Sequence, residues 1–495
     1  MKQEFERVQP QMVNISNDAI WNLLNRLEHD KTQMHGLMIM KDGKICAEGW
    51  WSPFAPGIVH GNQSLTKTYA ATAIGIAVTK KMLSLSDRII DFFPEEAEGE
   101  ILNLRVKDVL SMSCGMEEMP QASEHWIQDF LATKIEHPPG TEFFYNSVGS
   151  NLLAAIIKKV SNLGLVEFLQ KELFPLIGIE NDEFICYNLP DGTAAGGGGS
   201  YATLESNLRL MKLYADKGCC NGVRILSEEY VKLATTKQVD TNHRQDYNAA
   251  IRNSNCGYGY QIWMCDEANT FRADGAYGQF AIVNTDLNMI IAIHEVADLK
   301  EQGPEITLQA VMQFIREVKQ GIPEKQKITS ELLNRRLDTL CIPHPEKSKV
   351  KYPKDTILNK RYLLCSGEFD LERNVLPLLI GAKPTRGVTE FFLYETQDSL
   401  KLNVVQNGIR QELDIALDGS RRFNLIKFNE APANQAYYSA VWENDSILCL
   451  TGVWVQTCNT IVNRFYFTEK GCNIISTMSH GGVDDLTKEA VFCVS

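Results

Sequence analysis

The chain of 495 residues lacks any long hydrophobic run. Its apolar stretches, such as residues 73–78 and 289–293, are far shorter than the roughly 20 residues that a membrane-spanning helix needs. The N-terminal stretch MKQEFERVQPQ mixes both signs of charge and has no apolar core, so we expect no secretory signal. These absences predict that the protein has no membrane partner and, by default, is cytoplasmic.

Positive charge is also scarce. Lys and Arg together number 49 and Asp and Glu 62, so the formal net charge at pH 7 is −13. This excess of negative charge disfavours contact with phosphate backbones, and we expect no nucleic-acid partner. The thirteen cysteines are an odd number without a Cys-x-x-Cys pair, which favours reduced thiols over a disulfide framework.

The motifs of several catalytic and binding classes are missing. The sequence has no Gly-x-Ser-x-Gly elbow, no His-x-x-x-His pair and no cysteine–histidine cluster. The glycine run AAGGGGS at 194–200 lacks the Gly-Lys-Ser/Thr ending of a phosphate-binding loop, and we interpret it as a tight wall of a cleft. We therefore expect neither a metal ion nor another cofactor.

The order of the remaining patterns predicts an α/β domain over residues 1–322. Strand patterns stand at both ends of this stretch, around a mainly helical middle. The predicted segments are a helix at 15–26, a hairpin at 37–51, helices from 64 to about 235, strands at 257–265, 271–283 and 287–296, and a helix at 304–319. This order favours one antiparallel sheet, built from both ends of the domain, with flanking helices and an all-helical subdomain.

Residues 356–495 alternate apolar and polar side chains around tight turns, including Asn407-Gly408. The alternation predicts a second domain, an antiparallel β-barrel or sandwich that is lipocalin-like by analogy of fold only. Residues 323–355 are rich in Pro, Lys and Glu around one short helical pattern at 329–340, and we interpret them as a linker. Three roles stay open for the second domain: covering a functional site, holding a small ligand, or forming a homodimer.

Ser64 and Lys67 begin a segment that is apolar nearly all round, as in a buried helix. Their spacing places the hydroxyl and the amine on one helix face. A serine needs a base to become nucleophilic, and burial at a helix N-terminus lowers the pKa of a lysine toward that role. Ser348 and Lys351 match the same short pattern by chance in the linker.

Tyr145 lies between a Pro-Pro-Gly turn and a helical pattern. A nearby lysine ammonium would lower the pKa of its phenol, which could then relay protons. A packed aromatic side chain, with Ser147 as the helix N-cap, is the alternative interpretation. His60, four residues before Ser64, is a second candidate base for that serine.

Taken together, these segments resemble the serine β-lactamase and penicillin-binding-protein-like hydrolases. The resemblance is to the class C β-lactamase-related group, which includes esterases, D-aminopeptidases and 6-aminohexanoate-dimer hydrolases. It covers about residues 15–320. It rests on SLTK at 64–67, VKDVLSMSCGM at 106–116, PPGTEFFYNS at 138–147, AAGGGGSYAT at 194–203, and GYGYQIW at 257–263 followed by ADGAYGQF at 273–280.

The resemblance implies the chemistry of the site. It makes Ser64 the acylated nucleophile, Lys67 its base partner and Tyr145 the general acid/base. The backbone N–H groups of Ser64 and Ala276 would form the oxyanion hole.

The same resemblance assigns substrate binding to Ser147, Asp274 and Gly275, and two of these positions depart from the family pattern. Ser147 offers a hydroxyl where many members have an amide. The third motif, usually Lys-Thr-Gly or His-x-Gly, reads Ala273-Asp274-Gly275 and lacks its cation. Arg272 could replace the charge only if the strand were distorted, because neighbouring strand side chains face opposite ways. The change argues against β-lactams and peptidoglycan stem peptides as main substrates.

The leading hypothesis is a serine hydrolase that cleaves an ester or a non-peptide amide of a small molecule through an acyl-enzyme. One alternative is a non-catalytic binding or sensor protein that keeps the fold. Another is a D-stereospecific peptidase or a β-lactamase.

Overall fold

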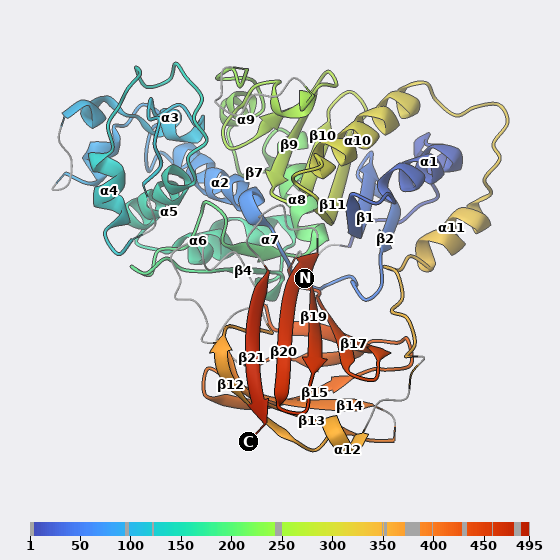
Figure 1. Cartoon of the computed structure of the whole chain (residues 1–495). Coiled ribbons are helices and arrows are strands. Elements are labelled where there is room, and N and C mark those ends of the chain that lie inside the picture. The colour runs from blue at the N-terminus through green and yellow to red at the C-terminus, as the bar shows by residue number, and fades with distance from the viewer. Residues whose placement is uncertain are drawn as a thin grey trace.

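The computed structural model describes residues 4–94, 99–120, 123–242, 250–348, 350, 354–371, 387–397, 399–427, 433–457, 459–479 and 487–494. Within these ranges the chain builds a layered helix-and-sheet unit above a β-rich unit (Figure 1). No helix among the described residues is long and apolar enough to cross a membrane.

The first unit is centred on a six-stranded antiparallel sheet with the order β2-β1-β11-β10-β9-β8. Its strands are β1 (Thr32–Lys41), β2 (Lys44–Trp50), β8 (Trp263–Met264), β9 (Thr270–Gly275), β10 (Gln279–Asn284) and β11 (Met289–Ala297). β1 and β11 pair side by side although more than 200 residues separate them in the sequence. The predicted antiparallel sheet built from both ends of the domain is therefore confirmed.

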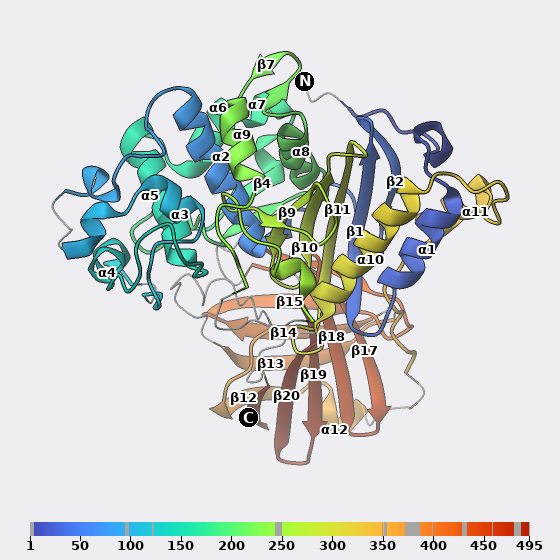
Figure 2. The same ribbon diagram turned by 90° about the horizontal axis from the view of Figure 1, so that it is seen from above.

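Helices cover both faces of this sheet. On one face α1 (Asn17–Leu27) and α10 (Gly303–Lys319) lie next to each other, as seen from above in Figure 2. On the other face α8 (Leu204–Ala215) packs against β10 and β11. All nine residues of β11 are buried, which agrees with a strand whose two faces are both covered.

The middle of the chain forms the predicted helical subdomain around α2 (Thr66–Thr79). The surrounding helices are α3 (Val106–Leu110), α4 (Trp126–Ala132), α5 (Ser147–Ser161), α6 (Leu165–Glu172), α7 (Phe174–Ile177) and α9 (Glu228–Ala234). Every residue of α2 from Thr66 to Ala77 is buried, so α2 is the central helix that its composition predicts. Small residues make this packing feasible: a Cβ added to Gly75 would lie 2.4 Å from the Tyr230 ring.

A three-stranded sheet connects residues 60–64, here called the nucleophile segment after the candidate nucleophile Ser64, to the glycine run. It contains β3 (His60–Gly61), β5 (Ser200–Ala202) and β4 (Phe184–Cys186) in the order β3-β5-β4. β3 leads directly to Ser64, and β5 directly follows the glycines. A two-stranded hairpin, β6 (Cys219–Cys220) and β7 (Val223–Arg224), lies beyond α8.

The C-terminal unit is a ten-stranded antiparallel sheet with the order β15-β14-β13-β12-β21-β20-β19-β18-β17-β16. Its strands are β12 (Arg361–Gly367), β13 (Val388–Glu395), β14 (Leu400–Gln406), β15 (Ile409–Ile415), β16 (Arg422–Leu425), β17 (Gln435–Asn444), β18 (Ile447–Trp454), β19 (Asn459–Phe467), β20 (Gly471–Ser479) and β21 (Lys488–Val494). Hydrogen bonds near the two ends of the sheet bring them together: Ala440 N donates to Ala416 O at 2.8 Å, and Asp414 N donates to Asn424 Oδ1 at 2.7 Å. The sheet therefore curls into a near-barrel, one of the two predicted forms.

The interior of this barrel is a packed core. Aromatic side chains pack against one another within it: Tyr362 stacks on Phe391 at 4.6 Å between ring centroids, and Phe465 packs edge-on against the Phe391 ring. The predicted turn Asn407-Gly408 joins β14 to β15, with both residues at positive φ.

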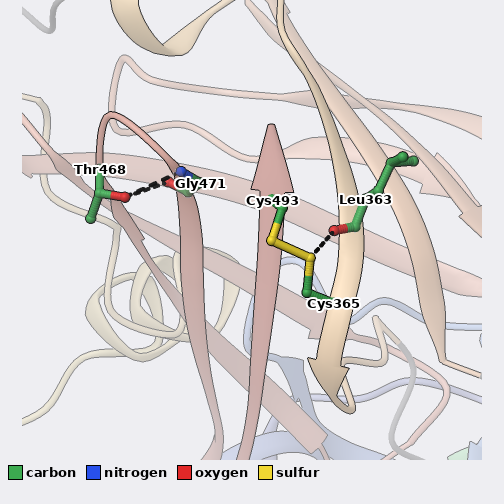
Figure 3. The surroundings of a disulfide bond; sticks show 5 residues. All are labelled: Leu363, Cys365, Thr468, Gly471 and Cys493. Carbon is green, nitrogen blue, oxygen red and sulfur yellow. Dashed lines mark hydrogen bonds between the residues drawn. A yellow bond between two sulfur atoms is a disulfide. The ribbon is translucent and has the colours of Figure 1, made fainter. Parts of the chain in front are cut away.

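A disulfide between Cys365 and Cys493 joins β12 and β21, the first and last strands of the barrel (Figure 3). The ten other cysteines among the described residues are free thiols. The expectation of reduced thiols therefore describes most of the cysteines, but not this pair. The two residues are 128 positions apart in the sequence, and only the strand pairing brings them together.

The segment that we interpret as a linker contains α11 (Ser330–Asp338), followed by α12 (Lys354–Ile357). Leu333 of α11 is fully buried in the same cluster as α1 and α10. Ser348 accepts a hydrogen bond from Trp442 N at 3.0 Å, whereas Lys351 lies outside the described residues.

The two units meet beside the nucleophile segment. The turn after β18 contacts β3, where Gly61 N donates to Gln456 O at 2.9 Å. Ala433 of the barrel packs with Val59 and Tyr201. The C-terminal unit thus contacts the chain three residues before Ser64.

Candidate active site

Ser64 lies on a 3-10 turn, Gln63–Leu65, that runs directly into α2. Gln63 takes a left-handed conformation (φ 50°), and both Gln63 and Leu65 are buried. Ser64 between them is partly exposed. The turn therefore presents this hydroxyl at the N-terminal end of a rigid, buried helix.

Lys67 occupies the first turn of α2 and is 1% exposed. Its Nζ donates a hydrogen bond to Ser64 Oγ at 2.9 Å and a second one to the Gly197 carbonyl. Burial lowers the pKa of Lys67 to about 7, against the opposing effect of the Asp274 carboxylate. A large fraction of this amine is therefore neutral at neutral pH.

The glycine run supplies the second partner of Lys67. Gly197 lies so close to α5 that an added Cβ would be 2.3 Å from the Ser147 carbonyl oxygen. Its backbone N–H donates to Asn151 Oδ1 at 2.8 Å. A residue without a side chain is needed here to bring the carbonyl against Lys67.

Tyr145 lies beside both of these residues, on the short connection before α5. Lys67 Nζ is 4.8 Å from the centroid of the Tyr145 ring, and the phenol forms a hydrogen bond with Ser64. Burial nevertheless raises the pKa of Tyr145, so the expectation of a lowered value is wrong. The reason is that desolvation of a phenolate costs more than the Ser64 hydrogen bond returns.

The start of α5 also differs from the expectation in one detail. Asn146 is the N-cap, because its Oδ1 accepts from Gly149 N at 2.9 Å. The alternative interpretation of Tyr145, which makes Ser147 the N-cap, is therefore wrong on this point. Ser147 is the first helical residue and is partly exposed.

The third motif lies at the end of β9. Arg272 Nε donates to Asp274 Oδ2 at 2.7 Å, since residues two apart on a strand share a face. Arg272 Nη1 also donates to the backbone carbonyls of Asn253 at 2.8 Å and Met264 at 3.1 Å. Burial raises the pKa of Asp274, while the Arg272 and Lys67 cations oppose that rise.

Gly275 brings β9 against the nucleophile segment. A Cβ at this position would lie 2.1 Å from the Asn62 carbonyl oxygen, so only glycine allows the approach. Ala276 follows in the turn to β10 and is exposed. The backbone of Ala276 therefore continues a strand end that lies directly beside the segment leading to Ser64.

The Beta-lactamase family model matches residues 24–298, more than half of the chain. The chain belongs to the beta-lactamase family. This is a family of serine hydrolases that includes 6-aminohexanoate-dimer hydrolase.

Individual members of the beta-lactamase family are distant from this chain. It is 24% identical over 239 residues to a 6-aminohexanoate-dimer hydrolase from Paenarthrobacter ureafaciens; the match covers 43% of this chain and 61% of the relative, less than two thirds of its length. A solved structure from Bacillus anthracis, described as a candidate 6-aminohexanoate-dimer hydrolase, superposes with a TM-score of 0.51 at 17% identity. That match covers 64% of this chain and 88% of the other and shows likeness of fold alone.

His60 is not positioned to act as a base for Ser64 in this member of the beta-lactamase family. Its Nε2 bonds with His35 Nδ1 at 2.9 Å and its Nδ1 contacts the Gly61 carbonyl at 3.3 Å, while the ring stacks on His294. Burial lowers the pKa of His60 to about 4, so the imidazole is neutral near pH 7. Both ring nitrogens are engaged away from Ser64.

The role of the Gly197 carbonyl could not be found from local patterns, because the sequence shows Gly197 only as part of a glycine run. The contact of Asp274 with Arg272 does have a local signal, since residues two apart on the predicted strand at 271–283 share a face. Among the described residues, no group of three or more His, Cys, Asp or Glu side chains could hold a metal ion.

Proposed function

We propose that the protein hydrolyses an ester or amide bond of a small molecule through an acyl-enzyme on Ser64. The observation that carries the proposal is the 2.9 Å hydrogen bond between Lys67 Nζ and Ser64 Oγ. A buried amine whose pKa lies at about 7 can accept the serine proton at neutral pH.

Acylation begins when neutral Lys67 takes the Ser64 proton while Oγ attacks the carbonyl carbon. The backbone N–H groups of Ser64 and Ala276 stabilise the resulting oxyanion. Tyr145 then donates its phenolic proton to the leaving group and receives the proton held by Lys67. The raised pKa of Tyr145 suits this role, because it keeps the phenol protonated and ready to donate.

Deacylation runs the same proton path in reverse. Water attacks the acyl carbonyl and gives its proton to the catalytic bases as the acid product forms. Ser64 leaves as the alcohol and regains its proton.

The third motif narrows the proposed substrates. The cation that meets a substrate carboxylate in many family members is missing, because Ala273 stands at its position, and Arg272 is held by Asp274 and by backbone carbonyls. We therefore propose esters or amides that do not need a free carboxylate, and not β-lactams or stem peptides. The same missing cation favours the second candidate, a non-catalytic binding protein that keeps the fold.

The test is the intact mass of the chain after exposure to a fluorophosphonate probe. We expect stoichiometric labelling of the native chain and of Ser348→Ala, and none of Ser64→Ala. Ser348 is the matched control, because it repeats the Ser-x-x-Lys pattern but bonds to Trp442 N. A folded native chain that takes no label would overturn the proposal in favour of the binding protein.

A further inference from the structure

We infer that Asp274 selects substrates that carry an ammonium group a few bonds from the scissile carbonyl. The substrate class is therefore aminoacyl esters or amides with a free amine. This inference rests on the proposed function of Ser64 and adds the charge of the substrate to it.

Of the Arg272–Asp274 pair on β9, Asp274 is the residue that a ligand can reach. The Arg272 side chain is 0% exposed, whereas the Asp274 side chain is 22% exposed. Arg272 Nη1 is bonded to two backbone carbonyls, and Arg272 Nη2 is enclosed by protein atoms. A ligand can therefore reach the carboxylate but not the guanidinium.

Asp274 also lies at the catalytic centre. The next residue of the strand, Gly275, lies against the Asn62 carbonyl oxygen, two residues before Ser64. The Asp274 charge acts on both Lys67 and Tyr145. Asp274 is two residues before Ala276 in the chain, so the Cα atoms of the two residues are at most roughly 7 Å apart. An ammonium bound to Asp274 would thus lie within a few bonds of a carbonyl held near Ser64 and Ala276.

The local charges favour an ammonium over the alternatives. An ammonium can donate a charge-assisted hydrogen bond to the accessible part of the carboxylate. A substrate carboxylate would meet a like charge in a partly buried place, where repulsion is poorly screened. A neutral group would neither form the charge-assisted hydrogen bond nor be repelled. Arg272 lies behind Asp274 and holds the carboxylate in place.

Three methyl esters of matched shape test the inference: β-alanine methyl ester, methyl butyrate and monomethyl succinate. They place an ammonium, a methyl group or a carboxylate at the same end of the acyl chain. For the native chain we expect kcat/KM to be about tenfold higher for the ammonium ester than for the butyrate, the effect of one charge-assisted hydrogen bond. The succinate should be the slowest of the three.

The decisive variant is Asp274→Asn, and the readout is the ratio of kcat/KM for the ammonium and neutral esters. This ratio cancels any general loss of activity, and we expect it to fall toward one. Asp91→Asn is the matched control, because Asp91 pairs with Arg88 in the same way on the surface, and it should keep the native ratio. Asp274→Glu retains the charge and the counterion and should keep a preference for the ammonium ester.

The possible failures can be told apart. If the probe does not label Ser64 and no ester is hydrolysed, the proposed function fails and the inference falls with it. If Ser64 is labelled but the native chain prefers the neutral or the carboxylate ester, the inference alone is overturned. The native ratio decides this even if Asp274→Asn does not fold.

Discussion

Lys67 shows how one residue can combine the demands of folding and chemistry. A lysine that is 1% exposed loses most of its hydration, and this loss lowers its pKa to about 7. The same burial places its Nζ against Ser64 Oγ and the Gly197 carbonyl. The same burial that packs the helix is thus what would make this amine a base in the proposed mechanism.

The lowered pKa of Lys67 determines how labelling by the fluorophosphonate should depend on pH. The reactive form has neutral Lys67, so the labelling rate should rise as pH increases through about 7 and then level off. In Asp274→Asn the rise should move to lower pH, because the carboxylate raises the pKa of Lys67. Lys67→Arg stays protonated throughout and should give no rise. A labelling rate that falls over this range would contradict the role of Lys67.

Tyr145→Phe removes the phenolic hydroxyl and keeps the aromatic ring. The ring packs against Trp263 at 6.0 Å between centroids, and phenylalanine keeps that contact. We expect ester hydrolysis to fall on the order of 10²–10⁴-fold, the usual contribution of a general acid/base, with little change in thermal midpoint. Steady-state kinetics and a thermal scan measure the two effects. Unchanged turnover would assign Tyr145 to packing alone.

At the scale of an element, α2 owes its position to small side chains. Ala and Gly let it pass through the centre of the helical subdomain, while its N-terminal turn carries Ser64 and Lys67. A helix with larger side chains would be displaced, and the two catalytic candidates would move with it.

Gly75→Ala tests this packing. Alanine is the better helix former by about 1 kcal/mol, yet its Cβ would lie 2.4 Å from the Tyr230 ring and 2.8 Å from Leu226. We expect the steric cost of overpacking to exceed the gain in helix propensity. The free energy of unfolding should therefore fall by about 1–3 kcal/mol, as measured by urea denaturation. Gly164→Ala is the control, since no atom outside its immediate chain neighbours lies within 3.5 Å of the added Cβ. A more stable Gly75→Ala variant would show that Tyr230 moves aside freely.

For the whole molecule, the contact between the two units lies next to the nucleophile segment. Gln456 supports the barrel side of this contact, because its Oε1 accepts from Asn434 N at 2.7 Å and from Gln435 N at 3.0 Å. Its backbone carbonyl accepts from Gly61 N. The turn after β18 therefore supports the backbone that leads to Ser64.

Gln456→Ala should weaken both the turn and the site. Two partly buried N–H groups would lose their acceptor, at a cost of about 2 kcal/mol in the free energy of unfolding. We also expect slower labelling of Ser64, because Gly61 lies three residues before it. Urea denaturation and the labelling rate are the two measurements. A loss of stability with an unchanged labelling rate would mean that the barrel contact does not position Ser64.

Some of this protein is determined by short stretches of sequence. The composition of α2 reveals a buried helix, and Ser64 with Lys67 at its start reveals a candidate nucleophile and base. The Asn407-Gly408 turn and the alternation around it reveal antiparallel strands. In each case, the physical cause is local: helix and strand periods, turn conformations and side-chain size act over a few residues.

Other features were decided only by the tertiary structure. The raised pKa of Tyr145, the Gly197 carbonyl on Lys67 and the Cys365–Cys493 disulfide all depend on which distant segments meet. Desolvation and hydrogen bonding act through space, so no local pattern records them. The sequence by itself determined which groups are available for chemistry. Packing decided their protonation, their partners and the charge that they present to a substrate.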